Sequence, residues 1–268
     1  MSSPSVPSTN SPSVLLKAAG VSKRFGGVRA LQSIDLVVRR GEIRGIIGPN
    51  GAGKTTLFNM LAGVMRPDTG TVQLDGVDIT RASMHQRVCL GMSRTFQTPQ
   101  LFPGMTVIEN VMAGTHVRHR SGMLQAMFGR DGIRREEEAV RMKAREIADF
   151  VGLRDEDDAL CATRSYGSQR RIEIARALAS EPQLLLLDEP MAGLNPAERA
   201  DLVELIRRIN QKTTVVLVEH NMRVVMALSG RITVLDFGTR IAEGTPDEIA
   251  RDPAVIRAYL GSGSVRAA

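Results

Sequence analysis

The sequence predicts an α/β fold with a parallel-sheet core, an antiparallel β subdomain and an inserted helical subdomain. Three observations predict it. Short apolar runs alternate with helical segments, residues 15–38 alternate between apolar and polar side chains, and the sequence between residues 106 and 178 has a helical pattern. Strands that alternate with helices favour a parallel sheet with crossover helices. At 268 residues the chain is long enough for one elaborated domain.

The first half of the chain contains the strand signals. Residues 15–38 predict antiparallel strands. Residues 43–47 form a short apolar strand that ends in a glycine-rich loop, and residues 55–65 carry apolar side chains at the spacing of one helix face. Residues 71–79 alternate again around Asp75-Gly76, a pair typical of a hairpin turn.

The second half continues the alternation of helices and strands. The expected elements are a helix at 133–151, a helix at 170–178, a strand at 184–187, a helix at 202–209, and strands at 214–218 and 232–235. The four consecutive leucines of the strand at 184–187 indicate burial on both faces. We therefore expect this strand to lie beside the strand at 43–47.

Composition and charge exclude several classes of protein. The net charge of +6 is scattered along the chain, and there are no Trp and two Tyr residues, so we expect no nucleic-acid partner. No run approaches the ~18 apolar residues of a membrane helix, so other chains would have to span a membrane. Cys89 and Cys161 lack a disulfide or metal spacing, which favours a reduced cytosolic compartment and two buried thiols.

A phosphate-binding loop follows the strand at 43–47. Its sequence, Gly48-Pro49-Asn50-Gly51-Ala52-Gly53-Lys54-Thr55, fits GxxxxGK[ST] between a predicted strand and a predicted helix. Backbone N–H groups of such a loop and the helix N-terminus bind phosphate oxygens. We expect Lys54 to reach the β and γ phosphates of ATP and Thr55 to offer its hydroxyl to Mg²⁺. Thr56, the next residue, is also predicted to bind ATP.

Two acidic residues follow the buried strand at 184–187. Asp188 ends the strand, where its carboxylate can face the Mg²⁺ held by Thr55. Glu189 is placed to orient or deprotonate an attacking water, because phosphoryl transfer depends mainly on positioning and charge stabilisation.

These motifs together resemble the ATP-binding-cassette (ABC) ATPases, a class of P-loop NTPases, from Leu15 to Gly261. The resemblance implies that Phe25 stacks on adenine, that Gln97 touches Mg²⁺ and water, and that His220 contacts the γ-phosphate. The run Ser165-Tyr166-Gly167-Ser168-Gln169 matches the signature loop, which in this family completes the ATP site of a partner subunit. The loop from Ala192 to Pro196 resembles the one that pairs two such subunits.

The signature departs from the family pattern at two positions. Arg164 stands where leucine is common, and Ser168 stands where Gly, Gln or Asp is usual. Backbone N–H groups and the Ser165 hydroxyl bind the phosphate at a helix N-terminus, so we expect both changes to spare the ATP contact. Their effect on the strength of signature binding stays open.

Within the family, the chain resembles the ATPases of bacterial branched-chain amino acid importers. The segments that carry this resemblance are 94–110, 166–171, 192–196, 219–222 and the ending 252–261. The resemblance implies a translocase that uses ATP and Mg²⁺ to power amino acid import, with branched-chain amino acids favoured, at the cytoplasmic face of the inner membrane. It implies a second ATPase subunit in a hetero- or homodimer, two integral membrane permeases and an extracytoplasmic substrate-binding protein.

The expected organisation is a disordered tail at 1–13, an ATPase domain at 14–250 with a helical subdomain at about 98–178, and a C-terminal segment at 251–268. Residues 97–105 are the candidate permease dock. Related importers of urea, amides or aromatic acids and a lipopolysaccharide exporter remain alternatives. A soluble, non-transport cassette protein is less favoured, because it would be expected to carry two cassettes or a long coiled-coil insertion.

Overall fold

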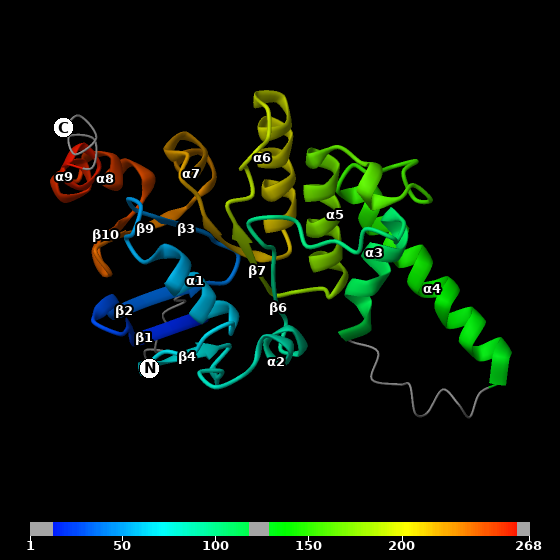
Figure 1. The fold of residues 1–268 in the computed structure, drawn as a ribbon, viewed down its shortest axis with the longest axis horizontal. Helices are drawn as coiled ribbons and strands as arrows, with labels where there is room; N and C mark the ends of the chain where they lie inside the picture. Colours follow the sequence, from blue (N-terminus) through cyan, green and yellow to red (C-terminus); the bar gives the residue numbers. More distant parts are fainter. Residues whose placement is uncertain (1–12, 118–128, 262–268) are drawn as a thin grey trace, which may run out of the picture.

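The computed structural model describes residues 13–117 and 129–261, so residues 1–12 of the predicted tail at 1–13 and the C-terminal residues 262–268 lie outside the described residues. A six-stranded sheet crosses the centre of the molecule in the order β10-β9-β3-β8-β7-β6 (Figure 1). Its strands are β3 (Ile43–Ile47), β6 (Met92–Arg94), β7 (Leu184–Asp188), β8 (Thr214–Val218), β9 (Arg231–Asp236) and β10 (Thr239–Gly244). β10 pairs antiparallel with β9, and the other pairs are parallel. The predicted α/β fold with a parallel core is confirmed.

One strand neighbour was predicted wrongly. β8 lies between β3 and β7, with Leu187 paired to Leu217, so the 184–187 strand does not lie beside the 43–47 strand. β3, β7 and β8 are buried along their whole lengths. An apolar run indicates a central strand but not its neighbour, and β8 is as apolar as β7.

A smaller antiparallel sheet covers one face of the central sheet. Its order is β2-β1-β4-β5, with β1 (Val14–Phe25), β2 (Val28–Arg39), β4 (Thr69–Leu74) and β5 (Val77–Asp78). Asp75 and Gly76 have φ values of 50° and 78°, as the predicted hairpin turn requires. Ile46, Leu186 and Val216 belong to the hydrophobic core that this sheet shares with α1 (Lys54–Ala62).

The opposite face of the central sheet forms a second core with the helices that follow β6 in the chain. Ile47, Leu185 and Leu217 contribute to it, since successive strand residues point to opposite faces. The helices outside the helical subdomain, besides α1, are α2 (Met84–Cys89), α6 (Pro196–Asn210), α7 (Met222–Leu228), α8 (Pro246–Arg251) and α9 (Pro253–Gly261). Within residues 13–117 and 129–261, no helix combines the length and apolarity needed to cross a membrane.

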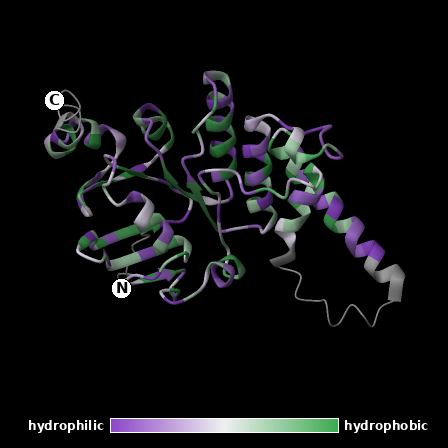
Figure 2. Cartoon of the chain, viewed as in Figure 1, coloured by the Kyte–Doolittle hydropathy of each residue, from purple (hydrophilic) through white to green (hydrophobic). Residues whose placement is uncertain are grey.

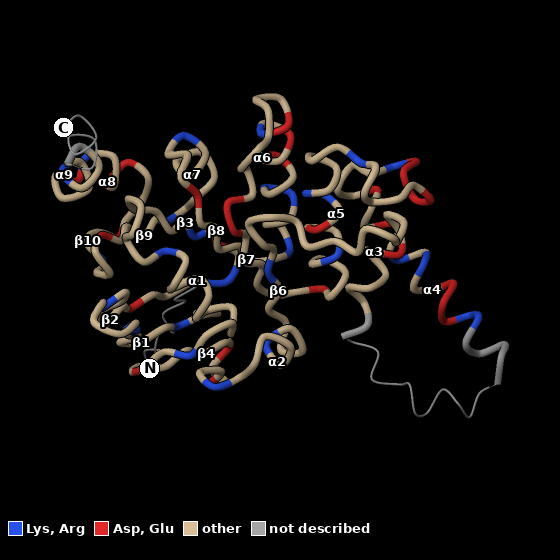
Figure 3. Tube along the Cα trace, in the orientation of Figure 1, with Lys and Arg blue, Asp and Glu red and all other residues tan. Residues whose placement is uncertain are grey.

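The helical subdomain extends away from the sheets (Figure 1). It contains α3 (Val107–Ala113), η1 (Gly114–Val117), α4 (Gly129–Phe150), η4 (Cys161–Thr163) and α5 (Tyr166–Ala179), and α5 packs against both α3 and α4. α4 is amphipathic: its polar side is strongly hydrophilic and carries charges of both signs (Figures 2 and 3).

The two cysteines differ in burial. Cys161 is buried in the helical subdomain, where burial raises the pKa of its thiol, whereas Cys89 at the end of α2 is exposed. The expectation of two buried thiols is therefore wrong for Cys89. The residue occupies the solvent side of a short surface helix, and a six-residue helix gives too little periodicity to assign its faces.

Candidate functional site

The glycine-rich loop after β3 lines a cavity of about 380 Å³. Its lining residues are Val28, Arg29, Ala30, the loop residues Asn50, Gly51, Ala52, Gly53, Lys54, Thr55 and Thr56, and finally His220 and Phe237. Gly53 has φ +98°, and a Cβ there would lie 2.7 Å from the Ala30 carbonyl oxygen, so both conformation and space require glycine. The structure thus brings most of the predicted ATP-binding residues together around one opening at the N-terminus of α1.

The Lys54 ammonium lies within this loop. It donates hydrogen bonds to the carbonyl oxygens of Gly48 and Pro49 at 2.7 and 2.9 Å. Burial lowers the pKa of Lys54, and the nearby charge of Glu189 partly offsets that shift. A buried ammonium at the N-terminus of α1 is suited to phosphate oxygens.

The three predicted catalytic residues come together in the segments that follow β6, β7 and β8. The Glu189 carboxylate lies 2.6 Å from Nε2 of His220 and accepts a hydrogen bond from the Gln97 amide at 3.1 Å. Glu189 has φ +45°, an unfavourable value for a residue with a side chain, and its N–H donates to the carbonyl of Val218. The strained backbone is found where the sequence predicts the reacting water.

Asp188 has a partner that the sequence analysis did not identify. Arg94 donates to its carboxylate at 3.1 Å and to Asn59 of α1 at 2.9 Å. Burial raises the pKa of Asp188, and the positive charge of Arg94 partly offsets the rise. Arg94 thereby links the strand end at Asp188 to the helix that begins at the phosphate-binding loop.

The predicted Mg²⁺ ligands have suitable chemistry. Thr55 offers a hydroxyl, Gln97 an amide oxygen and Asp188 a carboxylate, and oxygen donors of this kind suit a hard cation. Asp188 gives one oxygen to Arg94, which leaves its second oxygen for a further bond. The donor set therefore fits Mg²⁺.

Glu219 is a second residue whose role the sequence did not reveal. Its buried carboxylate accepts hydrogen bonds from the N–H groups of Met191 at 2.9 Å and His220 at 3.1 Å. Burial raises the pKa of Glu219. The side chain joins the loop after β7 to the loop after β8, and so fixes the backbone that carries His220. The sequence signal that could have identified Glu219 is its position directly before His220, a predicted site residue.

The predicted signature lies outside the cavity. Ser165 caps α5: its hydroxyl accepts a hydrogen bond from the N–H of Ser168 at 3.1 Å. None of the residues Ser165 to Gln169 lines the cavity. Instead, Tyr166 lies against Gly193, in the loop from Ala192 to Pro196. This exposed position at the end of a helix is compatible with a site completed by another subunit.

The aromatic residue that lines the cavity differs from the predicted one. Phe25 ends β1 with 49% of its surface exposed and is not a lining residue of the cavity, which is lined by Phe237 in the turn between β9 and β10. Phe237 is 82% exposed. Hydrogen bonds hold its turn: Gln32 donates to the Phe237 carbonyl, and the Gly238 N–H donates to the Ala52 carbonyl of the loop.

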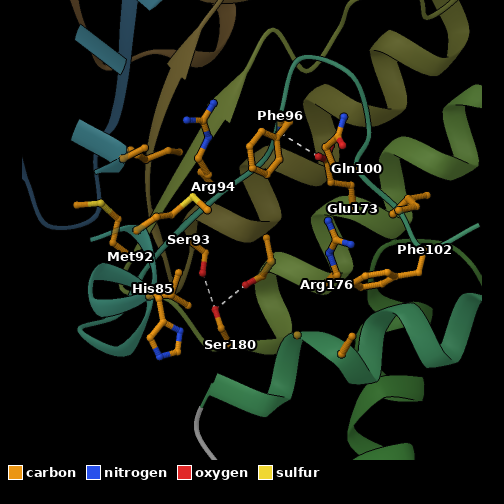
Figure 4. Close-up of a pocket in the computed structure, with 18 residues that line it drawn as sticks. His85, Met92, Ser93, Arg94, Phe96, Gln100, Phe102, Glu173, Arg176 and Ser180 are labelled. Carbon is orange, nitrogen blue, oxygen red and sulfur yellow. Dashed lines mark hydrogen bonds between the residues drawn. The ribbon is translucent and has the colours of Figure 1, made fainter. Parts of the chain in front are cut away.

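A larger cavity of about 700 Å³ lies where α2, α5 and the loop after β6 meet (Figure 4). Phe96, Leu101 and Phe102 line it, together with Met92 and Arg176. The Arg176 guanidinium lies 5.6 Å from the centre of the Phe102 ring. Burial lowers the pKa of Arg176. The predicted dock at 97–105 therefore forms part of the wall of an apolar groove with an arginine.

Two family models match the chain. A model described as "ABC transporter" matches residues 31–192, and one described as "Branched-chain amino acid ATP-binding cassette transporter" matches residues 239–265.

The chain is 42% identical over 249 residues to LivG of Salmonella typhimurium, a high-affinity branched-chain amino acid transport ATP-binding protein. It is 40% identical to BraF of Pseudomonas aeruginosa, described in the same terms. Each alignment covers 92% of this chain and 98% of the relative. The solved ADP conformation of MJ1267, an ATP-binding cassette of an ABC transporter, is 33% identical with a TM-score of 0.81, and covers 93% of this chain and 99% of that one.

Proposed function

This chain belongs to the ABC transporter family of ATP-binding proteins, and from that premise we propose that it powers the import of branched-chain amino acids. It binds ATP, and its ATP hydrolysis is linked to transport. The likeness to LivG and BraF, and the match of residues 239–265 to the branched-chain amino acid model, support this cargo.

The observation that carries the catalytic proposal is the cluster of Glu189, His220 and Gln97 beside the loop of Lys54. In the proposed mechanism the loop N–H groups and Lys54 bind the phosphates. Glu189 orients a water in line with the γ-phosphate and takes its proton, while His220 and Gln97 hold the carboxylate in place.

Thr55, Gln97 and Asp188 are the proposed ligands of Mg²⁺. When bound, the ion would neutralise the charge that develops on the transferred phosphoryl group. Arg94 keeps the Asp188 carboxylate oriented at the end of β7, through the 3.1 Å contact described above.

The substitution Glu189→Gln tests the catalytic proposal. It preserves the shape of the side chain but removes the base, so ATP turnover should fall about 10²- to 10⁴-fold while ATP binding is retained. Turnover by the purified transporter and equilibrium binding of ATP measure the two effects. Undiminished turnover would remove Glu189 from the mechanism.

The remaining proposals concern assembly. The subunit acts at the cytoplasmic face of the inner membrane with a second ATPase subunit, two permeases and an extracytoplasmic binding protein. Within the chain, residues 14–250 form the ATPase domain, with a helical subdomain at about 98–178, and residues 251–268 form an appended segment. The exposed signature at Ser165 supports a site shared between two ATPase subunits. The groove lined by Leu101 and Phe102 is the proposed permease dock.

A further inference from the structure

The side chain of Arg94, the last residue of β6, contacts the proposed Mg²⁺ ligand Asp188. Its guanidinium donates hydrogen bonds to one carboxylate oxygen of Asp188 at 3.1 Å, to the Asn59 side chain at 2.9 Å and to the Thr95 carbonyl at 3.2 Å. The side chains of Arg94 and Asp188 are only 7% and 9% exposed. Since water has little access to this ion pair, the guanidinium determines how the Asp188 carboxylate is oriented.

Two aromatic rings hold the guanidinium of Arg94 in place. It lies 5.2 Å from the centre of the Phe58 ring in α1 and 4.6 Å from the centre of the Phe96 ring. A guanidinium within about 6 Å of a ring centre is attracted to the face of the ring. Phe58 is fully buried, so its ring is a fixed support. The rings therefore restrict the guanidinium in addition to its hydrogen bonds.

Arg94 and Phe96 also belong to the wall of the groove that contains the proposed permease dock. Figure 4 shows their side chains next to one another on that wall. The proposed Mg²⁺ ligands Thr55, Gln97 and Asp188 are not lining residues of the groove. Arg94 is thus in contact with a metal ligand and, at the same time, accessible from the groove.

From these contacts we infer that Arg94 is a positioning residue for Mg²⁺. It holds the Asp188 carboxylate with one oxygen left for the ion, and its place on the groove wall makes this arrangement sensitive to what occupies the groove. The inference rests on the proposed ATPase function and deepens it. Partners that orient a metal-binding carboxylate typically contribute a factor of about 10 to 100 to metal affinity. Binding in the groove and binding of Mg²⁺ would then change each other's affinity by the same factor.

The first test is Arg94→Met, which removes the guanidinium but keeps an unbranched apolar side chain. Calorimetry measures the affinity for a non-hydrolysable ATP analogue in Mg²⁺ and in EDTA, and the ratio of the two affinities gives the contribution of the ion. We expect the ratio to fall about ten-fold while the affinity in EDTA is retained. Arg94→Lys keeps the charge but loses the planar fork, so its ratio should be intermediate. An unchanged ratio, including one that results from equal losses of both affinities, would overturn the inference.

Arg87→Met is the matched control for the loss of a buried arginine. Arg87 also donates hydrogen bonds to α1, but to the carbonyl oxygens of Met60 and Leu61 in its last turn. This variant should have a lower melting temperature and an unchanged ratio. An equal fall of the ratio in Arg87→Met would contradict a specific role of Arg94.

Asp188→Asn provides the reference for a damaged metal ligand. Its ratio should fall at least as far as that of Arg94→Met, because it removes the charge that Arg94 orients. An unchanged ratio in Asp188→Asn would remove Asp188 from the metal site, and the inference with it. If the unsubstituted chain bound no analogue at all, the proposed function itself would fail.

The link to the groove is tested by Phe96→Leu, which removes the ring and leaves the hydrogen bonds of Arg94 available. We expect the ratio to fall about two- to five-fold, the effect of losing one contact between a guanidinium and a ring. Phe150→Leu is the control, since the Phe150 ring contacts Arg208 and does not line the groove. An unchanged ratio in Phe96→Leu would overturn the link between the groove and the metal.

Discussion

Glu189 shows how the site concentrates strain and charge on one residue. Its backbone is left-handed, its carboxylate contacts His220 and Gln97, and its charge affects the pKa of Lys54. Left-handed conformations at residues with side chains are unfavourable and persist where the surrounding structure enforces them. The hydrogen bond from the Glu189 N–H to Val218 supplies that constraint, so the carboxylate is held before ATP arrives.

Phe237 leads to a prediction about base recognition. The ring is 82% exposed beside the loop, and an aromatic ring at the cavity wall gains energy by stacking on a base. We expect Phe237→Ala to weaken ATP binding about two- to ten-fold while leaving the affinity for inorganic triphosphate unchanged. Phe25→Ala is the comparison variant. If only Phe25→Ala weakened ATP binding, the base would stack on Phe25 as the sequence predicted.

The helix α5 connects the predicted signature to the segment that carries Gln97. Arg170 donates to the carbonyl oxygens of Phe96 and Gln97, both at 2.6 Å, and Glu173 accepts from the N–H of Phe96. Arg170 and Glu173 form an ion pair with 0% and 1% side-chain exposure. Since α5 begins at Tyr166, one helix holds both the signature and the segment that carries Gln97.

Removal of the ion pair between Arg170 and Glu173 should destabilise the folded chain. Arg170→Met removes the ion-pair partner of the buried Glu173 carboxylate, and we expect the free energy of unfolding to fall by about 3–5 kcal/mol. Arg141→Met is the control: it removes the exposed ion pair with Asp158 and should cost less than about 1 kcal/mol. Denaturant unfolding measures both. Equal falls in the free energy of unfolding would show that the buried ion pair contributes no more to stability than the exposed one.

The stability of Arg170→Met should also depend on pH. Burial already raises the pKa of Glu173 above its unfolded value, and removal of Arg170 raises it further. A carboxyl with a raised pKa binds its proton more tightly in the folded state, so stability increases as the pH falls through the folded-state pKa. The loss of stability in Arg170→Met, relative to the unsubstituted chain, should therefore be largest at neutral pH and become smaller as the pH falls.

At the scale of the whole molecule, the groove at the junction of the sheets and the helical subdomain is the proposed permease dock, where transport would be linked to hydrolysis. Its wall includes Phe96, next to Gln97, and Arg176 from the signature helix. A segment that moved in this groove would therefore act on both parts of the ATP site. The groove and the cavity at the loop of Lys54 have no lining residue in common.

Phe102→Ser tests this coupling. The substitution replaces an apolar wall of the groove by a hydroxyl, so amino acid uptake by the assembled transporter should be lost while ATP turnover persists. Met142→Ser is the control, since Met142 is exposed on α4 and lies outside both residues 97–105 and the groove. Uptake in cells and ATPase activity of the purified complex are measured together. A proportional fall of both activities would contradict a coupling role.

The local patterns of the sequence were sufficient for the fold class and for most of the residues that the structure brings together at the candidate site. GxxxxGK[ST] specifies a loop conformation through neighbouring glycines, and periodicity specifies strands and helices, so both can be read within a few residues. The order of β3, β8 and β7, and the pairs Arg94 with Asp188 and Glu219 with Met191, could not be read in this way. These contacts join residues far apart in sequence, and they form only when parallel strands of similar hydrophobicity take their places in one sheet.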